Sequence, residues 1–202
     1  VIFNDANFNG GGGYNLGNAT VSLLDLVSTY NSAENGGFLF NSGNVSITGF
    51  NLHIGFNSAD YGGAMANIDG PTVTLDSCTI SFNHANHYGG VFYNQPCSPS
   101  ITNSNFYSNT ADEFGGVMFN ILNASPAITN SSLYLNTADN GSIMANFVQS
   151  SPSMDGCTIF NNTATDNGGV FYNHNSSPSI LNSNIRVNKA LSGAVMANFG
   201  QS

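Results

Sequence analysis

A short motif, Gly-Gly-x-x-x-Asn, returns about every 26 residues through this 202-residue chain. It occupies residues 36–41, 62–67 and 89–94 and continues to residues 193–198, where Ala194 takes the second glycine position. A period of 20 to 50 residues is typical of a solenoid, in which each repeat forms one coil that packs on its two neighbours. We therefore expect residues 1–202 to form a single repeat array.

Two further patterns keep the same period between these motifs. One is an apolar residue three places before an asparagine that is followed by x-Ala, as in residues 80–85, and the other is Ser-Pro-x-apolar, as in residues 98–101. All three segments are short, rich in β-branched or large apolar residues, and bounded by Gly, Pro, Asn or Ser, which indicates strands. The sequence thus predicts an all-β fold, a right-handed single-stranded parallel β-helix with three short strands per coil and seven to eight coils.

Asparagines recur at two fixed phases of the repeat. In stacked coils a side-chain amide can hydrogen-bond to the same amide one coil along, and it can also satisfy backbone groups left unpaired where the chain turns. We therefore expect two asparagine ladders at corners of the coil. The first contains Asn41, Asn67, Asn94, Asn120, Asn146, Asn173 and Asn198, and the second contains Asn31, Asn57, Asn83, Asn109, Asn136, Asn162 and Asn188.

Both ends of the chain are in phase with the repeat. Residues 1–6 read like residues 80–85, and residues 198–202 track residues 146–150. Solenoids need caps that close their exposed cores and edges, and the sequence shows no such cap. We therefore expect the chain to be a fragment of a longer array.

The charge balance restricts the partners. The chain has two Lys and Arg residues against eleven Asp and Glu residues, a formal net charge of −9. Nucleic acids and anionic membrane surfaces both require clustered basic side chains, so neither is an expected partner. No apolar run reaches the roughly 18 residues of a membrane span. Membrane association is expected only through regions outside this chain.

The sequence offers little for catalysis. Glycoside hydrolysis needs two carboxyl groups about 5 to 9.5 Å apart on one groove. The lyase reaction of pectate-lyase-like β-helices needs a basic residue beside a carboxylate calcium site. Arg186 has no carboxylate cluster at its phase, and no neighbouring strands present a pair of aspartates. We expect no catalytic residue and no cofactor.

Titratable residues gather along one expected loop edge. Carboxylates follow the second-ladder asparagines, at Glu34, Asp60, Asp112, Asp139 and Asp166, and His84 and His87 share the loop between them. Aspartate is a common turn residue because its side chain bonds to nearby backbone groups, so the edge is interpreted as a solvated turn without a metal. Cys78 and Cys157 lie three coils apart, too far for a disulfide, and Cys97 belongs to another corner.

The apolar residues inside the motif suggest a surface. If Leu39 and its equivalents point into the core, strand alternation turns the following side chains outward. The resulting candidate contact stripe contains Phe40, Tyr93, Phe119 and Tyr172. Such a stripe would contact another chain, a neighbouring domain or a sugar. The alternatives are that a loop covers these positions or that the alternation is inverted.

The motif Gly-Gly-[Ala/Val]-x, followed on the next strand by Phe-x-x-Asn, resembles the repeat of the chlamydial polymorphic outer-membrane proteins and of related repeat proteins in environmental bacteria and archaea. Residues 106–109 keep the full Phe-x-x-Asn form, whereas Ile80, Leu133, Ile159 and Ile185 replace the phenylalanine elsewhere. The resemblance covers the whole chain and implies a secreted, surface-displayed stalk or adhesin.

Together these observations predict an extracellular or cell-surface structural or adhesive β-helix without a catalytic centre. It would act as a stalk, adhesin or filament component through lateral or end-to-end contacts. The expected partners are other copies of the chain, surface proteins or glycans. The alternative is a β-helix that binds or degrades polysaccharides, because one fold hosts many functions.

Overall fold

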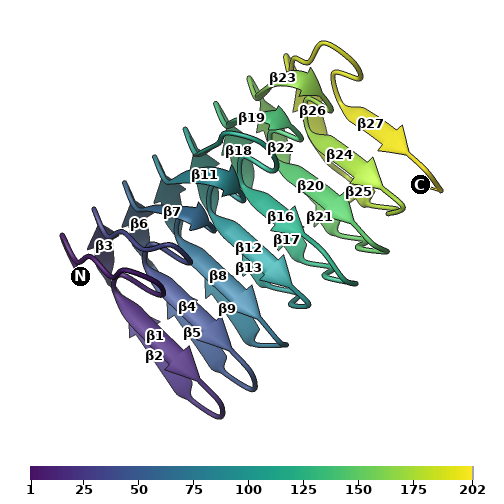
Figure 1. The fold of residues 1–202 in the computed structure, drawn as a ribbon. Coiled ribbons are helices and arrows are strands. Elements are labelled where there is room, and N and C mark those ends of the chain that lie inside the picture. The colour runs from purple at the N-terminus through teal and green to yellow at the C-terminus, as the bar shows by residue number, and fades with distance from the viewer. Residues whose placement is uncertain (202) are drawn as a thin grey trace.

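The computed structural model describes residues 1–201, and every regular element in them is a β-strand. The chain winds through about seven turns of about 26 residues, and each strand pairs in parallel with strands one coil before and one coil after. Figure 1 shows the resulting rod, with the N-terminus at one end and the C-terminus at the other. The expected parallel β-helix is confirmed.

Sheet 1 carries the Gly-Gly-x-x-x-Asn motif and has eight strands. In order along the rod they are β1 (Gly13–Leu16), β4 (Leu39–Ser42), β8 (Met65–Ile68), β12 (Phe92–Gln95), β16 (Met118–Asn120), β20 (Met144–Phe147), β24 (Phe171–His174) and β27 (Met196–Phe199). The register pairs each motif asparagine with the next, as Asn41 with Asn67. The period of the sequence is therefore the period of the sheet.

Sheets 2 and 3 follow sheet 1 in each coil and have seven strands each. Sheet 2 consists of β2 (Thr20–Leu24), β5 (Ser46–Phe50), β9 (Thr72–Asp76), β13 (Ser100–Thr102), β17 (Ala127–Thr129), β21 (Ser153–Asp155) and β25 (Ser179–Leu181). Sheet 3 consists of β3 (Val27–Thr29), β6 (His53–Gly55), β10 (Thr79–Ser81), β14 (Asn105–Tyr107), β18 (Ser132–Tyr134), β22 (Thr158–Phe160) and β26 (Asn184–Arg186). These sheets and sheet 1 provide the expected three strands per coil.

The structure adds a smaller sheet that the sequence did not predict. Sheet 4 has five strands and lies between sheet 3 and the next motif. Its strands are β7 (Ser58–Tyr61), β11 (His84–Tyr88), β15 (Thr110–Ala111), β19 (Thr137–Asn140) and β23 (Thr163–Asn167). In Figure 1 it runs along the upper edge of the rod.

One hydrophobic core runs through the centre of the coils. Strand alternation places one residue of each pair inside, as in β9, where Val73 and Leu75 are buried and their neighbours are not. Phe92, Phe106 and Phe171 are the largest of the fully buried side chains in its middle and C-terminal part. Burying apolar surface is the main favourable term in folding, and here each coil buries its share against both neighbours.

The second asparagine ladder lies at the turn between sheets 3 and 4. The Oδ1 atom of Asn109 accepts hydrogen bonds from the backbone N–H of Asn83 at 3.1 Å and from the Asn83 side chain at 3.0 Å. The Asn109 amide donates in turn to Asn136, and also to the backbone carbonyl of Ile80. Each of these asparagines thus satisfies buried backbone groups that no strand can pair. The predicted corner position of this ladder is confirmed.

The first ladder also forms but lies within strands. Asn120 accepts from Asn94 and donates to Asn146, both at 2.9 Å, and all three side chains are fully buried. Its residues belong to the strands of sheet 1, so the expectation of a corner was wrong for this ladder. The backbone groups of sheet 1 are paired between coils, and the amides therefore bond to one another.

The two glycines of the motif have different roles. The first has a φ angle near +65° in every coil, for instance +69° at Gly89, and a Cβ there would lie 2.1 Å from the carbonyl oxygen of Phe92. A Cβ at Gly90 would lie 2.3 Å from the Gly116 oxygen. That second position nevertheless admits a side chain elsewhere, because Ser142 occupies it, fully buried, and donates to the carbonyl oxygen of Gly169.

We predict that Asn109→Ala destabilises the protein about twice as much as Asn120→Ala. The first change strands the Asn83 backbone N–H and the Ile80 carbonyl, although the Asn83 amide keeps its bonds to the Ile54 and Ser81 carbonyls. The second change removes bonds between side chains only. At about 1–3 kcal/mol for each buried unpaired group, we expect losses of about 4 and about 2 kcal/mol. Urea unfolding curves measure both, and equal losses would contradict the distinction between the ladders.

We also predict that Gly89→Ala is far more damaging than Gly90→Ala. The added Cβ at position 89 meets the backbone of its own turn, which cannot move without breaking the corner, and we expect a loss of at least about 3 kcal/mol. At position 90 the surrounding backbone can adjust to a side chain, as it does around Ser142, and we expect a loss of stability of about 1–2 kcal/mol. Thermal unfolding of the two purified variants provides the comparison, and a Gly89→Ala variant as stable as Gly90→Ala would refute it.

Candidate functional site

Sheet 4 forms the floor of an open polar groove. Its central row is alanine, as at Ala85, Ala111 and Ala138, and these side chains point inward and are buried. The residues on either side of each alanine face outward, and they are Ser, Thr or His on one side and mostly Asp, Glu or Asn on the other. Small buried residues keep the floor flat, while hydroxyl, carboxylate and amide groups form the two walls.

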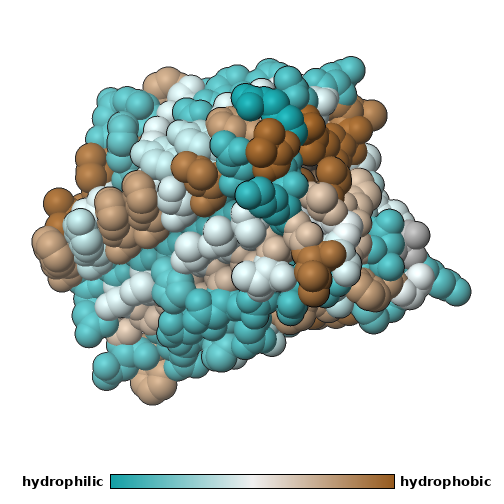
Figure 2. Space-filling model, turned by 90° about the horizontal axis from the view of Figure 1, so that it is seen from above, coloured by the Kyte–Doolittle hydropathy of each residue, from teal (hydrophilic) through white to brown (hydrophobic). Residues whose placement is uncertain are grey.

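The groove has two parts along the rod. The larger, about 580 Å³, is lined by residues that include Asp5, Glu34 and Asp60, and the second, about 480 Å³, by residues that include Asp112 and Asp139. Figure 2 views the molecule from the side on which sheet 4 lies, and hydrophilic and neutral residues cover most of that face. The acidic residues of the predicted loop edge therefore do line one edge of the rod.

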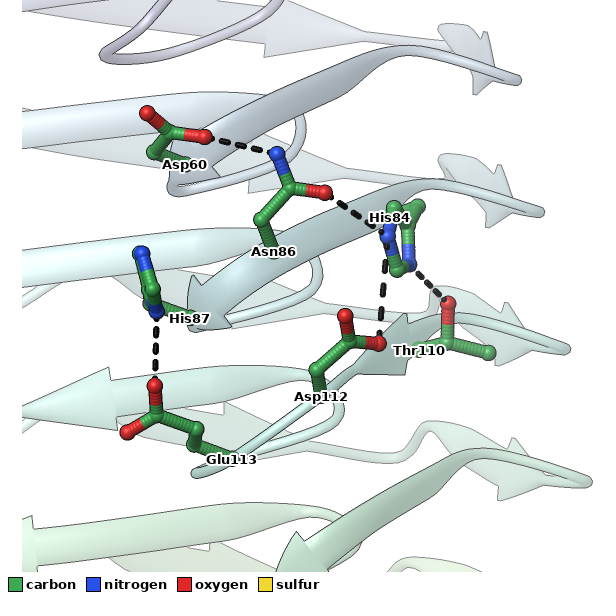
Figure 3. A network of polar contacts seen from close by, with 7 residues as sticks. All are labelled: Asp60, His84, Asn86, His87, Thr110, Asp112 and Glu113. Carbon is green, nitrogen blue, oxygen red and sulfur yellow. Dashed lines mark hydrogen bonds and ion pairs between the residues drawn. The ribbon is translucent and has the colours of Figure 1, made fainter.

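Between these parts, the two histidines belong to a polar network (Figure 3). Nδ1 of His84 lies 2.8 Å from Oγ1 of Thr110, and its Nε2 lies 3.2 Å from Oδ1 of Asn86. The Asn86 amide donates to Asp60 at 2.6 Å. Nε2 of His84 also lies 3.9 Å from Oδ1 of Asp112, so these contacts join three successive coils and leave neither ring nitrogen of His84 free.

His87 has a partner of its own. Its Nδ1 lies 2.6 Å from Oε1 of Glu113 on the next coil, and its ring stacks on Tyr61. Within residues 1–201 no group of three or more His, Cys, Asp or Glu side chains could hold a metal ion. The carboxylates bond to amide, hydroxyl or imidazole groups one coil away, such as Asp60 to Asn86 and Asp139 to Thr165, and not to the backbone of their own turn as expected from the sequence.

The cysteines are buried and free, and none is placed as a nucleophile. Burial raises the pKa of Cys97 to about 12, and its Sγ donates to the carbonyl oxygen of Pro71. Burial also raises the pKa values of the Cys78 and Cys157 thiols. The thiolate is the reactive form of cysteine, and a raised pKa disfavours it. These three residues therefore act as part of the core.

The candidate contact stripe is largely covered. Its side chains point away from the core, as the alternation predicted, but Phe40 and Phe119 are only 9% and 5% exposed, and Tyr93 and Tyr172 are half-buried. Rings from the flanking positions pack over them. Phe119, for example, stacks on Tyr88 at 4.6 Å and lies 5.3 Å from Phe147.

The stripe is therefore part of an aromatic cluster on the outer face of sheet 1. Expecting four freely exposed rings was wrong, because the sequence did not reveal that aromatic side chains before and after each strand fold back on the same face. The alternative of a covering loop is also only partly correct, because the cover includes the strand residues Tyr88 and Phe147. Alanines at the same phase, Ala66 and Ala145, are fully buried beneath the cluster.

A more exposed aromatic surface lies at the turn between sheets 3 and 4. We call Phe3, Tyr30, Phe56 and Phe82 the aromatic ladder. Successive rings stack at 4.8 to 5.0 Å with interplanar angles of 6° to 14°, and their exposed fractions run from 76% at Phe3 to 44% at Phe82. Tyr30, Phe56 and Phe82 each precede a second-ladder asparagine, and Phe3 precedes Asn4, which donates to Asn31 and extends that ladder by one coil. All four aromatic residues have a positive φ angle, which turns the side chain outward.

Our sequence analysis missed this ladder. The signal in the sequence is an aromatic residue at one phase in four successive coils, directly before the asparagine. A second stack begins where the first ends: Tyr107, Tyr134 and Phe160 stack at 5.2 and 5.0 Å, and Arg186 lies over Phe160 at 4.5 Å. Phe82 meets Tyr107 edge-on at 5.5 Å. Aromatic contacts thus continue along the length of the rod.

Comparisons with known proteins identify no relative: no family model, no curated protein and no solved structure matches the chain. Within the described residues, no helix has the length and hydropathy required to cross a membrane. The structure defines the class of the chain, a parallel β-helix with asparagine ladders.

Proposed function

We propose that this chain is an extracellular or cell-surface structural or adhesive β-helix that acts through lateral contacts. The observation that supports this function best is the aromatic ladder. Monomeric soluble proteins rarely expose a continuous row of large apolar side chains unless the row contacts something. The expected partners are other copies of the chain, surface proteins or glycans.

The shape of the aromatic ladder favours a lateral contact. The ring faces contact one another in the stack, so the exposed surface consists of ring edges repeated at the spacing of the coils. A repeated row of edges suits an extended partner surface lying parallel to the rod. None of the four residues is charged, so a partner can approach without displacing an ion pair.

The ladder can be removed without disturbing the turn. Asn161 occupies the same phase as Phe56 and Phe82 with a φ angle of +56°, so the turn accepts asparagine. We predict that the triple variant Tyr30→Asn, Phe56→Asn, Phe82→Asn folds but loses at least tenfold in self-association or in binding to cells or matrix. Sedimentation velocity and adhesion to coated surfaces measure these two properties.

A matched control is available on sheet 2. Thr48→Asn, Thr74→Asn and Ser100→Asn make the same type of change at three exposed positions in successive coils. The control variant should behave like the unmodified protein. If the unmodified protein stays a dispersed monomer and binds neither cells nor matrix, the proposed function is wrong. If the triple aromatic variant retains full activity, the aromatic ladder is not the contact surface.

The polar groove over sheet 4 favours a second candidate, binding or degradation of polysaccharides. Its walls of hydroxyl, carboxylate and amide groups could hydrogen-bond to sugar hydroxyls along several coils. This function predicts that neutral glycans or uronates bind or turn over, and that Asp60→Asn or Asp112→Asn abolishes the effect. Assays of polymer retention and product release test it, and a panel without retention or product would remove this candidate.

A further inference from the structure

The outer row of sheet 3 has an interrupted stack of rings. From the C-terminal side the row reads Arg186, Phe160, Tyr134 and Tyr107, then Ser81, Gly55 and Thr29, each in register with the next. Tyr107 therefore stacks on Tyr134 on one side and is paired in register with the small Ser81 on the other, while Phe82 at the neighbouring turn meets its ring edge-on. Where the stack would continue, Ser81 and Gly55 leave space.

That space is a notch of about 240 Å³. Its lining includes the small residues Gly55 and Ser81, the aromatic residues Phe56 and Tyr107, and the polar residues His53 and Thr79. Pockets for drug-sized ligands measure roughly 300–1,000 Å³, so this notch suits a single ring. The lining contains no carboxylate, lysine or arginine.

The polar groups of the notch are available. Across residues 1–201 no hydrogen bond engages the side chains of His53, Thr79 or Ser81, although Ser81 is only 8% exposed. The contrast with His84 and His87 is clear, because their ring nitrogens contact side chains of adjacent coils. Hydroxyl and imidazole groups beside an aromatic wall can recognise a ligand that is apolar on its face and polar at its rim.

We propose that the notch binds one sugar ring, a neutral pyranose at the end of a glycan. The sugar's C–H face would lie against Tyr107, where the partial positive charge of the C–H groups meets the negative face of the ring. Its hydroxyls would bond to His53, Thr79 and Ser81. An aromatic side chain from a protein would leave those three groups unpaired, which costs affinity. This inference rests on the proposed adhesive function and specifies a glycan as the ligand.

Filling the notch provides the test. In Ser81→Tyr the new ring would extend the stack from Tyr107 and occupy the position of the sugar, while His53, Thr79 and Tyr107 keep their identities. Ser100→Tyr is the matched control, because Ser100 is exposed on sheet 2, outside the notch. Both variants should unfold at or near the temperature of the unmodified chain.

The probes are the methyl glycosides of glucose, galactose, mannose, fucose and N-acetylglucosamine, with N-acetylphenylalaninamide as the aromatic alternative. We expect at least one glycoside to bind the purified chain at millimolar concentration in saturation-transfer NMR and to shift the Tyr107 ring signals. Ser81→Tyr should weaken that binding at least tenfold, and Ser100→Tyr should not change it.

Three results would overturn the inference: no glycoside binds, Ser81→Tyr binds as well as the unmodified chain, or only the phenylalanine derivative binds. Adhesion of the same variants separates this inference from the proposed function. If Ser81→Tyr adheres normally while the triple aromatic variant does not, the adhesive function stands and the notch is not its sugar site. If a glycoside binds in the notch but the chain adheres to nothing, the notch is a sugar site and the adhesive function fails.

Discussion

The fold depends on the hydrogen bond from a backbone N–H at one turn to the side-chain amide of the next coil. At the turn between sheets 3 and 4 the residue before each ladder asparagine has a positive φ angle, and in the last coil this residue is the β-branched Val187. Such a conformation costs of order 1–3 kcal/mol. The bond from the Asn83 backbone to Asn109, repeated along the rod, satisfies groups that would otherwise be buried and unpaired.

The same turn also determines which side chains lie on the surface. Because the positive φ angle directs the asparagine inward, it also directs the preceding side chain outward, and in four successive coils that side chain is an aromatic ring. The rings then stack at the separation that the sheets impose. The exposed aromatic ladder is thus a consequence of how the backbone at the turn is satisfied, and the notch beside it exists because Gly55 and Ser81 are small.

Much of the fold could be predicted from the sequence because, in a solenoid, residues one repeat apart in the sequence pair with each other in the sheets. The strict spacing from Asn57 to Asn83 to Asn109 identified both the stacking and the second ladder. Sheet 4 was missed because its strands, such as His84–Tyr88, are mostly polar around one buried alanine and so show no alternation of large apolar residues. The cover over Phe119 was missed because it comes from side chains on the flanking turns, such as Phe114, whose direction depends on tertiary packing.

The asparagine ladders also have a direction. In every rung of both ladders the donor belongs to the earlier coil and the acceptor to the later one. The same holds for Asn15 and Asn4, which extend the ladders by one coil through bonds to Asn41 and Asn31. The amide dipoles therefore point the same way, with their positive ends toward the C-terminal coils, and each polarises the next. Two lines of aligned amide dipoles therefore run along the axis of the rod, as the peptide dipoles do in a helix, although the strands run across that axis.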